Sequence, residues 1–241
     1  MAQALYESIT DKVIPTSSAS LAEATKVFEN TYRLINIAFV DEMKIAFDRM
    51  GLDIWEIIDA ASSKPFGFTA FYPGPGIGGE CIPVDPLYLA WKGKEYDAPT
   101  EMIEVASRIN YQATRYVADT IYRCFNERFK CINGSKILIL GAAFKKDVTD
   151  IRESPTLRLI PLLRSRGAHV AYSDPLVPHL AAFNMDSIPL DEETLASFDC
   201  VVIITDHSLF DFPWICKHSE LIVDTRNATK NLAEFKHKIV K

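Results

Sequence analysis

The chain has 241 residues, of which 48% are apolar, and a net charge of -6 from 26 basic and 32 acidic residues. This length and composition suffice for one large domain or two smaller ones and exclude a disordered chain. Because the basic residues are dispersed through an acidic chain, a broad nucleic-acid-binding surface is excluded and only local basic pockets remain.

The cysteines and the N-terminal segment indicate a cellular compartment. Five cysteines, an odd number without a C-x-x-C pair, argue against a disulfide framework and favour a reducing environment. No apolar run approaches the roughly 18 residues that cross a bilayer, and the first residues lack the apolar core of a signal peptide. We expect a cytoplasmic protein with no membrane or nucleic-acid partner. We also expect no metal site, because the five histidines show no metal-ligand spacing.

The first half of the chain has a helical pattern. Apolar residues recur at helical spacing over residues 20–50, which predicts one long helix that ends at Gly51 and is followed by a helix capped by Asp53. A second long helical pattern covers about residues 99–129. Residues 1–132 are therefore predicted to form a helical domain, whose long first helix invites pairing with another helix.

Between these two helices lies the glycine-rich run GPGIGGECIPVDP, residues 74–86. Four glycines in six positions indicate a loop shaped for close contact with a ligand. Pro83 and Pro86 favour a helix that begins near Pro83. Cys81 lies just ahead of that start, where the positive end of the helix favours the thiolate. Asp85 follows four residues later, so the spacing predicts a nucleophile with a carboxylate beside it.

The second half of the chain has an alternating pattern. After the turn signal Asn133-Gly134, strand-like runs alternate with helical stretches, which predicts a parallel α/β sheet. The strand-like runs are residues 136–140, 169–172, 200–204 and 221–223. We therefore expect an α/β fold in which a helical domain, residues 1–132, precedes a Rossmann-like domain, residues 133–241.

Ligands of such sheets bind beyond the carboxyl ends of the strands. Phe144 and Lys145 follow the first predicted strand, and Arg226 follows the last. Lys146 and Arg152 add positive charge near the first of these strand ends. A local basic pocket of this size suffices for a nucleotide diphosphate.

Four segments together resemble motifs of the UDP-glucose/GDP-mannose dehydrogenase family. GPGIGGECIPVDPLYL, residues 74–89, resembles its active-cysteine segment, and AEATKVFENTYR, residues 22–33, resembles its central helix. GAAFKKD, residues 141–147, with DIRESP, residues 150–155, resembles its nucleotide-sugar-binding signature. DTRN, residues 224–227, resembles a late arginine motif. The segments occur in the family's order and span nearly the whole chain.

Finer features resemble one branch of the family, which oxidises UDP-N-acetylhexosamines to uronic acids. These are ENTYR at residues 29–33, KPFGF at residues 64–68 and YPGPG at residues 72–76. Glu80 departs from that branch, which usually places histidine immediately before the cysteine. A carboxylate turned toward the thiol would disfavour the thiolate, so we predict that Glu80 points outward.

The resemblance implies a covalent mechanism at the cysteine. Cys81 is expected to add to the sugar aldehyde, giving a thiohemiacetal and then a thioester that water cleaves. Lys26 and Asn30, one helical turn apart, are expected to stabilise the developing oxyanion, and Asp85 to position or deprotonate the water. The residues alone leave alternatives open, since single cysteines are often buried and inert and a Lys/Asn pair often lies on a solvated helix face.

The resemblance also assigns substrate-binding residues in the second half of the chain. Lys145 and Arg226 are expected to bind the diphosphate, and Phe144 to pack near the uridine. Arg152 is expected to pair with Glu153 or with the phosphates. In the alternative, Arg152 and Glu153 form a purely structural ion pair and Phe144 belongs to the core.

Three residues of the first half complete the implied substrate site. Gly78 lies in the glycine-rich loop, Lys64 is expected to contact the sugar or the substrate of a neighbouring subunit, and Arg33 the N-acetyl group or the loop.

The family resemblance implies a partner domain and a cofactor. A Rossmann domain that holds NAD is expected before the central helix, yet this chain begins at the central region and has no G-x-G-x-x-G after an N-terminal strand. We therefore expect NAD to be bound by an N-terminal domain absent from this chain, and the chain to be inactive alone. A homodimer through the long central helix is expected as well.

Two functions are consistent with the sequence. The first is part of an NAD-dependent UDP-N-acetylglucosamine 6-dehydrogenase serving surface-polysaccharide synthesis, or the same chemistry on UDP-glucose, UDP-N-acetylmannosamine, UDP-N-acetylgalactosamine or GDP-mannose. The second is a non-catalytic module that binds a UDP-sugar or dimerises with a complete enzyme.

Overall fold

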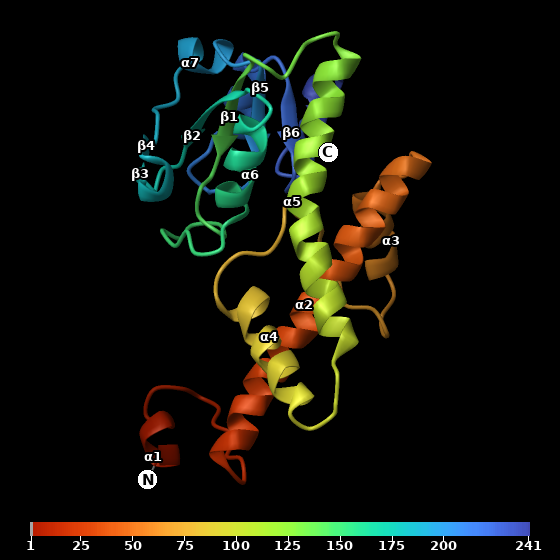
Figure 1. Cartoon of the computed structure of the whole chain (residues 1–241), viewed down its shortest axis with the longest axis vertical. Coiled ribbons are helices and arrows are strands. Elements are labelled where there is room, and N and C mark those ends of the chain that lie inside the picture. The colour runs from red at the N-terminus through yellow and green to blue at the C-terminus, as the bar shows by residue number, and fades with distance from the viewer. Residues whose placement is uncertain (1) are drawn as a thin grey trace.

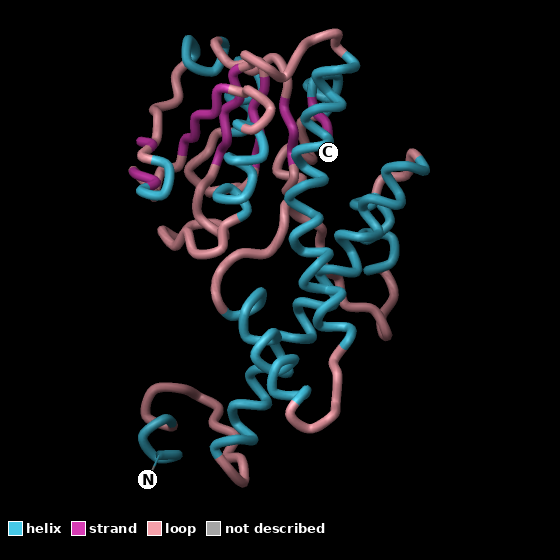
Figure 2. Tube along the Cα trace, viewed as in Figure 1, coloured by secondary structure: helices cyan, strands magenta, loops and turns pink. Residues whose placement is uncertain are grey.

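The computed structural model, which describes residues 2–241, consists of a helical half followed by a parallel-sheet half (Figures 1 and 2). The helices of the first half are α1 (Ala2–Tyr6), α2 (Ala19–Met50), α3 (Ile54–Ser62), α4 (Cys81–Lys94) and α5 (Glu101–Glu127). The second half contains α6 (Pro155–Arg164), α7 (Glu192–Ala196), α8 (Phe212–His218) and the 3-10 helices η1 (Ala181–Phe183) and η2 (Ala233–Lys238). This arrangement confirms the predicted fold class.

Helix α2 is the long helix that the apolar spacing predicts. It begins after Ser18, whose hydroxyl accepts a hydrogen bond from Leu21 N at 3.2 Å. It ends at Gly51, which adopts a left-handed conformation (φ 73°) that glycine tolerates best. Asp53 then caps α3, as predicted, by accepting from Trp55 N.

A three-helix core joins α2, α4 and α5. Buried apolar residues from all three helices pack together, namely Leu34, Ala38, Ala90, Ile103, Ala106 and Ile109. Helix α4 begins at Cys81, two residues before the predicted start, with Glu80 as its N-cap. The earlier start is possible because the first-turn amides have no intrahelical partner, so Pro83 fits at the third helical position. Cys81 is thus the first helical residue rather than a residue ahead of the helix.

The second half is built on a five-stranded parallel sheet in the order β2-β1-β5-β6-β7. Its strands are β1 (Lys136–Leu140), β2 (His169–Ser173), β5 (Cys200–Ile203), β6 (Ile222–Asp224) and β7 (Ile239–Val240). Strands β3 (His179–Leu180) and β4 (Met185–Asp186) form a separate hairpin. Apolar side chains on both faces of the large sheet are buried, as expected for parallel strands covered by helices.

Helix α5 takes part in both cores. Its first part packs in the three-helix core, while Val117, Ile121 and Phe125 pack with β1, β5 and α6 on one face of the sheet. Figure 1 shows α5 running from the sheet down to its crossing with α2. The two halves therefore share one rigid element.

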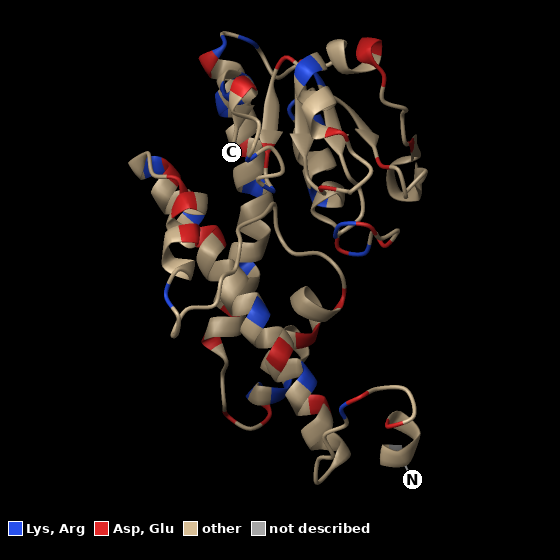
Figure 3. Cartoon of the chain, turned by 180° about the vertical axis from the view of Figure 1, so that it is seen from behind, with Lys and Arg blue, Asp and Glu red and all other residues tan. Residues whose placement is uncertain are grey.

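Charged residues lie on both halves of the molecule and on most of its helices (Figure 3). Among residues 2–241, no helix combines the length and the apolar character that a membrane span requires.

Candidate active site

The predicted nucleophile lies at the N-terminal end of α4. Cys81 is exposed there, and Asp85 is half-buried one turn further along the helix. Asn30 of α2 is fully buried, and its Nδ2 donates a hydrogen bond to Asp85 Oδ2 at 2.8 Å. This amide orientation is the one that lets Asn30 donate to the carboxylate. The structure therefore joins Asn30 to Asp85 at the contact of α2 with α4, one helical turn from Cys81.

Lys26, the fourth predicted catalytic residue, lies on the exposed surface of α2. Its Nζ is 3.9 Å from Glu29 Oε2, and its side chain is 56% accessible. Arg33 pairs with the same carboxylate of Glu29 from the other side. Arg33 therefore makes an ion pair on its own helix rather than one with the glycine-rich loop. Lys64 lies exposed in the segment that follows α3.

The glycine loop, residues 74–79, packs against the segment after β1. A Cβ on Gly78 would lie 2.6 Å from Phe144 Cβ and 2.8 Å from the carbonyl oxygen of Glu153, so only glycine fits. Gly79 N donates to the carbonyl oxygen of Arg152 at 2.7 Å. Gly78 thus contacts the predicted nucleotide-sugar segment directly, and the loop joins that segment to α4.

Arg152 pairs with partners that differ from the predicted one. Its guanidinium donates to both carboxylate oxygens of Asp150 and lies 2.6 Å from Glu80 Oε2. Asp150, two residues away, presents its carboxylate to the planar guanidinium in a bidentate geometry, whereas Glu153 adopts a left-handed backbone conformation (φ 50°). The expected pairing of Arg152 with Glu153 is therefore wrong. The ion pair of Glu80 agrees with the prediction that this exposed side chain points outward.

Phe144 and Lys145 follow β1, as predicted. Phe144 is half-buried against the glycine loop, and Lys145 is exposed with its Nζ 5.8 Å from the centre of the Phe144 ring. An exposed cation beside an aromatic ring is a suitable arrangement for an anionic ligand that also has a flat ring.

Arg226 lies beyond the carboxyl ends of β5 and β6. Its Nε donates to the carbonyl oxygen of Ile204 at 2.8 Å, which orients the guanidinium. The glycine loop begins directly against it, because a Cβ on Gly74 would lie 2.8 Å from Arg226 Nη1. Gly74 N in turn donates to Asp41 Oδ1 of α2 at 2.9 Å. Burial raises the pKa of Asp41 to about 7, against the opposing effects of the Gly74 hydrogen bond and the Arg226 charge.

Two buried residues that the sequence analysis did not assign hold the segment after β1. Asp174, at the end of β2, accepts hydrogen bonds from Ala142 N, Ala143 N and His207 Nε2. His207 Nδ1 accepts from Asp147 N at 3.0 Å. Burial acts to raise the pKa of Asp174, but its hydrogen bonds hold that pKa below the usual value. The available sequence signal was an Asp-Pro pair that begins two residues after the predicted strand of residues 169–172.

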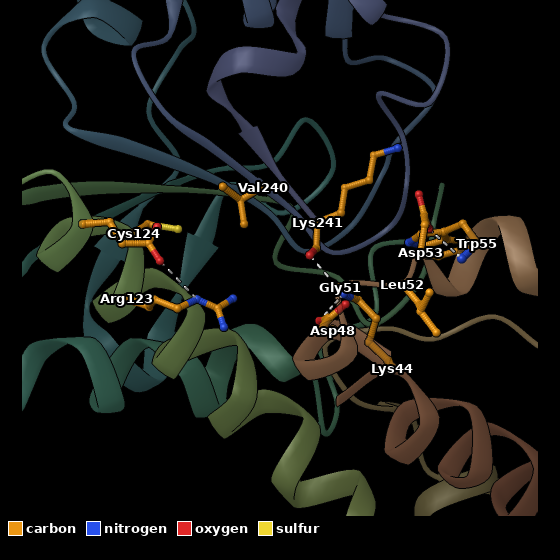
Figure 4. A pocket seen from close by; sticks show the side chains of 11 residues that line it. Lys44, Asp48, Gly51, Leu52, Asp53, Trp55, Arg123, Cys124, Val240 and Lys241 are labelled. Atoms are coloured by element: carbon orange, nitrogen blue, oxygen red, sulfur yellow. Dashed lines mark hydrogen bonds and ion pairs between the residues drawn. The ribbon is translucent and has the colours of Figure 1, made fainter. Parts of the chain in front are cut away.

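A separate cavity of about 480 Å³ lies between the end of α2, α5 and the last residues of the chain (Figure 4). Lys44 donates a hydrogen bond to the carbonyl oxygen of Lys241 at its edge. None of the predicted site residues lines this cavity. Within residues 2–241, no group of three or more His, Cys, Asp or Glu side chains is placed to hold a metal ion.

The α/β half does not have the geometry of a dinucleotide site. In such sites a glycine-rich turn leads from the first strand directly into a helix whose N-terminus faces the pyrophosphate. Here β1 ends at Leu140, α6 begins only at Pro155, and Gly141 is the single glycine of the connection. The residues of this half therefore do not fit NAD.

Comparison with known proteins identifies the two halves separately. Residues 20–112 match the central domain of the UDP-glucose/GDP-mannose dehydrogenase family, and residues 138–231 match its UDP binding domain. The chain is 34% identical over 236 residues to UDP-N-acetyl-D-mannosamine dehydrogenase of Methanococcus maripaludis, covering 94% of this chain and 52% of that protein. It is 32% identical to UDP-N-acetyl-D-glucosamine 6-dehydrogenase of Pseudomonas aeruginosa, covering 87% of this chain and 50% of that protein.

The fold agrees with these relationships. The solved structure of the UDP-D-ManNAc dehydrogenase of Pyrococcus horikoshii superposes with a TM-score of 0.83 at 29% identity, covering 95% of this chain and 54% of that chain. The chain spans about half the length of the curated relatives it matches. With both domain types present in the expected order, the chain belongs to the UDP-glucose/GDP-mannose dehydrogenase family.

Proposed function

We propose that this chain is the central and UDP-binding part of an NAD-dependent dehydrogenase that oxidises C6 of a UDP-N-acetylhexosamine to a carboxylate. The observation that carries the proposal is the exposed thiol of Cys81 at the first position of α4, one turn from an Asp85 carboxylate that Asn30 orients. Relatives named for UDP-N-acetylmannosamine and for UDP-N-acetylglucosamine support the substrate class. UDP-N-acetylglucosamine remains our predicted substrate within it.

The residues of this chain have defined roles in the proposed reaction. The Cys81 thiolate adds to the C6 aldehyde, and the aldehyde oxygen takes up a proton to complete the thiohemiacetal. Hydrogen-bond donors near the reacting carbon stabilise the transient oxyanion. Lys26 is one predicted donor, and it would have to turn inward from its exposed position to contribute. After the thioester has formed, Asp85 accepts a proton from the attacking water, and Cys81 leaves as the thiolate.

NAD would supply the acceptor for the two hydrides that the oxidation releases. Because the α/β half of this chain does not fit a dinucleotide, we propose that a domain outside this chain holds it. The nucleotide-sugar would bind between the glycine loop and the strand ends, with Lys145 and Arg226 near the diphosphate and Phe144 near the uridine. Arg152 is engaged with two carboxylates, so its contact with phosphate would require one of those ion pairs to open.

We further propose that the chain forms a homodimer through α2. Large apolar side chains on this helix are exposed, among them Phe28 at 72% and Phe39 at 55%. An apolar groove of about 270 Å³ runs beside Phe39 between α2 and α5, lined in part by Met102 and Val105. Large exposed apolar patches mark sites of contact with other proteins.

The alternative is a module that binds the nucleotide-sugar without turning it over, which the half-length match to the relatives keeps open. Calorimetric titration of the chain with UDP, UDP-N-acetylglucosamine, UDP-N-acetylmannosamine, GDP-mannose and NAD, each alone, tests the assignment. We expect the uridine ligands to bind and NAD not to bind.

Arg226→Gln should weaken UDP binding by about tenfold or more, since a hydrogen bond to a charged group contributes roughly 1.5–3 kcal/mol. Arg166→Gln is the matched control for that variant, because Arg166 lies in the same half and its guanidinium stacks on Tyr122 instead. Binding of GDP-mannose in preference to the uridine ligands would contradict the proposed substrate class. Binding of none of the five would contradict a nucleotide-sugar site assembled by this chain alone.

A further inference from the structure

The backbone of the glycine loop is held by side chains rather than by a neighbouring strand or helix. Thr114 Oγ1 of α5 donates to the carbonyl oxygen of Pro75 at 2.7 Å. Asn110, also on α5, bonds both sides of one residue: its Oδ1 accepts from Ile77 N, and its Nδ2 donates to Ile77 O at 3.3 Å. Asn110 and Thr114 are each only 1% exposed. Buried loop backbone needs such partners, because unpaired amide and carbonyl groups are costly.

A second group reaches the same carbonyl from the α/β half. Arg158 of α6 donates from Nη2 to Ile77 O at 3.1 Å. Its guanidinium lies over the ring of Tyr111, 5.0 Å from the ring centre. The approach depends on Gly76, because a Cβ there would lie 3.1 Å from Arg158 Nη2 and 3.0 Å from Thr114 Oγ1. The Ile77 carbonyl is thus bonded by one side chain from each half of the molecule.

Considered for stability alone, the buried position of the Arg158 guanidinium is unfavourable. Its Nε and Nη1 are buried without a hydrogen-bond partner among residues 2–241, and burial lowers the pKa of its guanidinium. An apolar side chain of similar length would fill this space without burying unpaired donors. Its guanidinium directs the hydrogen bond from Nη2 at the loop that leads to Cys81.

The start of α4 depends on this loop. Glu80, the N-cap residue, makes no side-chain capping bond, so α4 does not fix its own first turn in the usual way. The loop is held at Ile77 by Asn110 and Arg158 and again at Gly79, whose amide donates to Arg152 O. Cys81 follows two residues later as the first residue of the helix.

We infer that Asn110 and Arg158 are positioning residues that hold the Ile77 peptide between the two halves and so place Cys81 at the first turn of α4. The inference rests on the proposed role of Cys81 as nucleophile. The first turn of α4 presents backbone amides without intrahelical partners, which can stabilise the transition state as the sulfur attacks, so displacement of the loop should slow the reaction of the thiol.

Alkylation by iodoacetamide at about pH 7.5, followed by peptide mass spectrometry, tests the inference on the full chain. Exposed Cys131 is an internal reference for reagent access, and buried Cys124, Cys200 and Cys216 report unfolding. In the unaltered protein, we expect Cys81 to react faster than Cys131. Arg158→Met should lower the rate ratio of Cys81 to Cys131 by about fivefold, the factor that corresponds to the loss of one typical hydrogen bond.

Two further variants make the result specific. Arg158→Lys retains the charge and one donor, so its rate ratio should lie between those of the unaltered protein and of Arg158→Met. Arg164→Met, on the same helix, removes an exposed guanidinium that lies over Phe183 and should leave the ratio unchanged. In the double variant with Arg158→Met, Asn110→Ala should lower the rate ratio by a smaller factor than it does alone, because both side chains act on one peptide group.

An unchanged or higher ratio in Arg158→Met, with the buried thiols still protected, would overturn the inference while the proposed function stands. If Arg158→Met exposes the buried thiols, Arg158→Lys carries the test, and a ratio equal to that of the unaltered protein overturns the inference. Cys81 reacting no faster than Cys131 in the unaltered protein would overturn the proposed nucleophile and the inference with it.

Discussion

At the scale of single residues, Gly74 and Gly78 exclude a side chain for different reasons. At Gly78 the obstacle is Phe144 Cβ and the backbone of Glu153, which cannot move independently. At Gly74 the obstacle is the end of the flexible Arg226 side chain. Gly78 is therefore required by the fold, whereas Gly74 leaves room for the guanidinium of Arg226.

This contrast predicts two separable effects of alanine. Gly78→Ala should lower the free energy of unfolding by about 1–3 kcal/mol, because the loop and the segment after β1 must move apart. Gly74→Ala should cost under about 1 kcal/mol of stability, yet weaken UDP binding by roughly tenfold as the guanidinium shifts. Urea unfolding and calorimetric titration measure the two quantities. Equal losses of stability in both variants would contradict this distinction.

Asp85 provides a second test at this scale, in the proposed enzyme completed by the NAD-binding domain that we propose for it. Asp85→Asn keeps the shape of the side chain but cannot accept a proton from water, so hydrolysis of the thioester should slow more than its formation. Intact-mass spectrometry during turnover should then show a sugar adduct that Cys81→Ser lacks. NAD reduction without any adduct would argue against hydrolysis as the role of Asp85.

At the scale of secondary-structure elements, α2 carries a buried carboxylate whose ionisation opposes folding. The pKa of Asp41 is about 7 in the folded chain and near 3.8 when exposed to water. Between these pH values the folded state holds a proton that the unfolded state has lost. The ionisation of Asp41 therefore leaves the free energy of unfolding unchanged below about pH 4. It lowers that free energy as the pH rises to about 7 and has no further effect above that pH.

Asp41→Asn should remove this pH dependence, because an amide still accepts from Gly74 N and does not ionise. We expect the variant to be more stable than the unaltered chain at about pH 8, by on the order of 3 kcal/mol, and to differ less at about pH 5. Urea unfolding at both pH values measures the difference. Asp11→Asn, at an exposed carboxylate, is the control. A stability difference independent of pH would contradict a titrating Asp41.

Helix boundaries show where the sequence was informative. Apolar spacing and Gly51 predicted α2 almost to the residue, because a glycine C-cap is a local signal. The start of α4 was predicted two residues late, because proline is compatible with several first-turn positions. The predicted domain boundary near residue 132 remains a prediction, and α5 contributes to the cores on both sides of it.

At the scale of the whole molecule, the exposed apolar face of α2 predicts self-association. Sedimentation velocity should show twice the 27.1 kDa mass of the chain at micromolar concentration. Phe39→Asp should yield the monomer, because burying an unpaired carboxylate in an apolar interface is costly. Leu209→Asp, at an apolar residue of the α/β half that is even more exposed than Phe39, should leave the dimer intact. A monomer in the unaltered chain would refute the dimer.

The sequence by itself determined the helical half, four of the five strands of the parallel sheet and the segments that carry the candidate chemistry, but not β7. These follow from residue periodicity, turn residues and motif order, all of which are local in the chain. Only the tertiary structure decided which side chains meet. It brought Asn30 to Asp85 across 55 positions, left Lys26 at the surface, and gave Arg152 the partners Asp150 and Glu80. Those outcomes depend on how α2, α4 and the segment after β1 pack together, since the geometry of contacts between distant segments is not encoded in any short stretch of sequence.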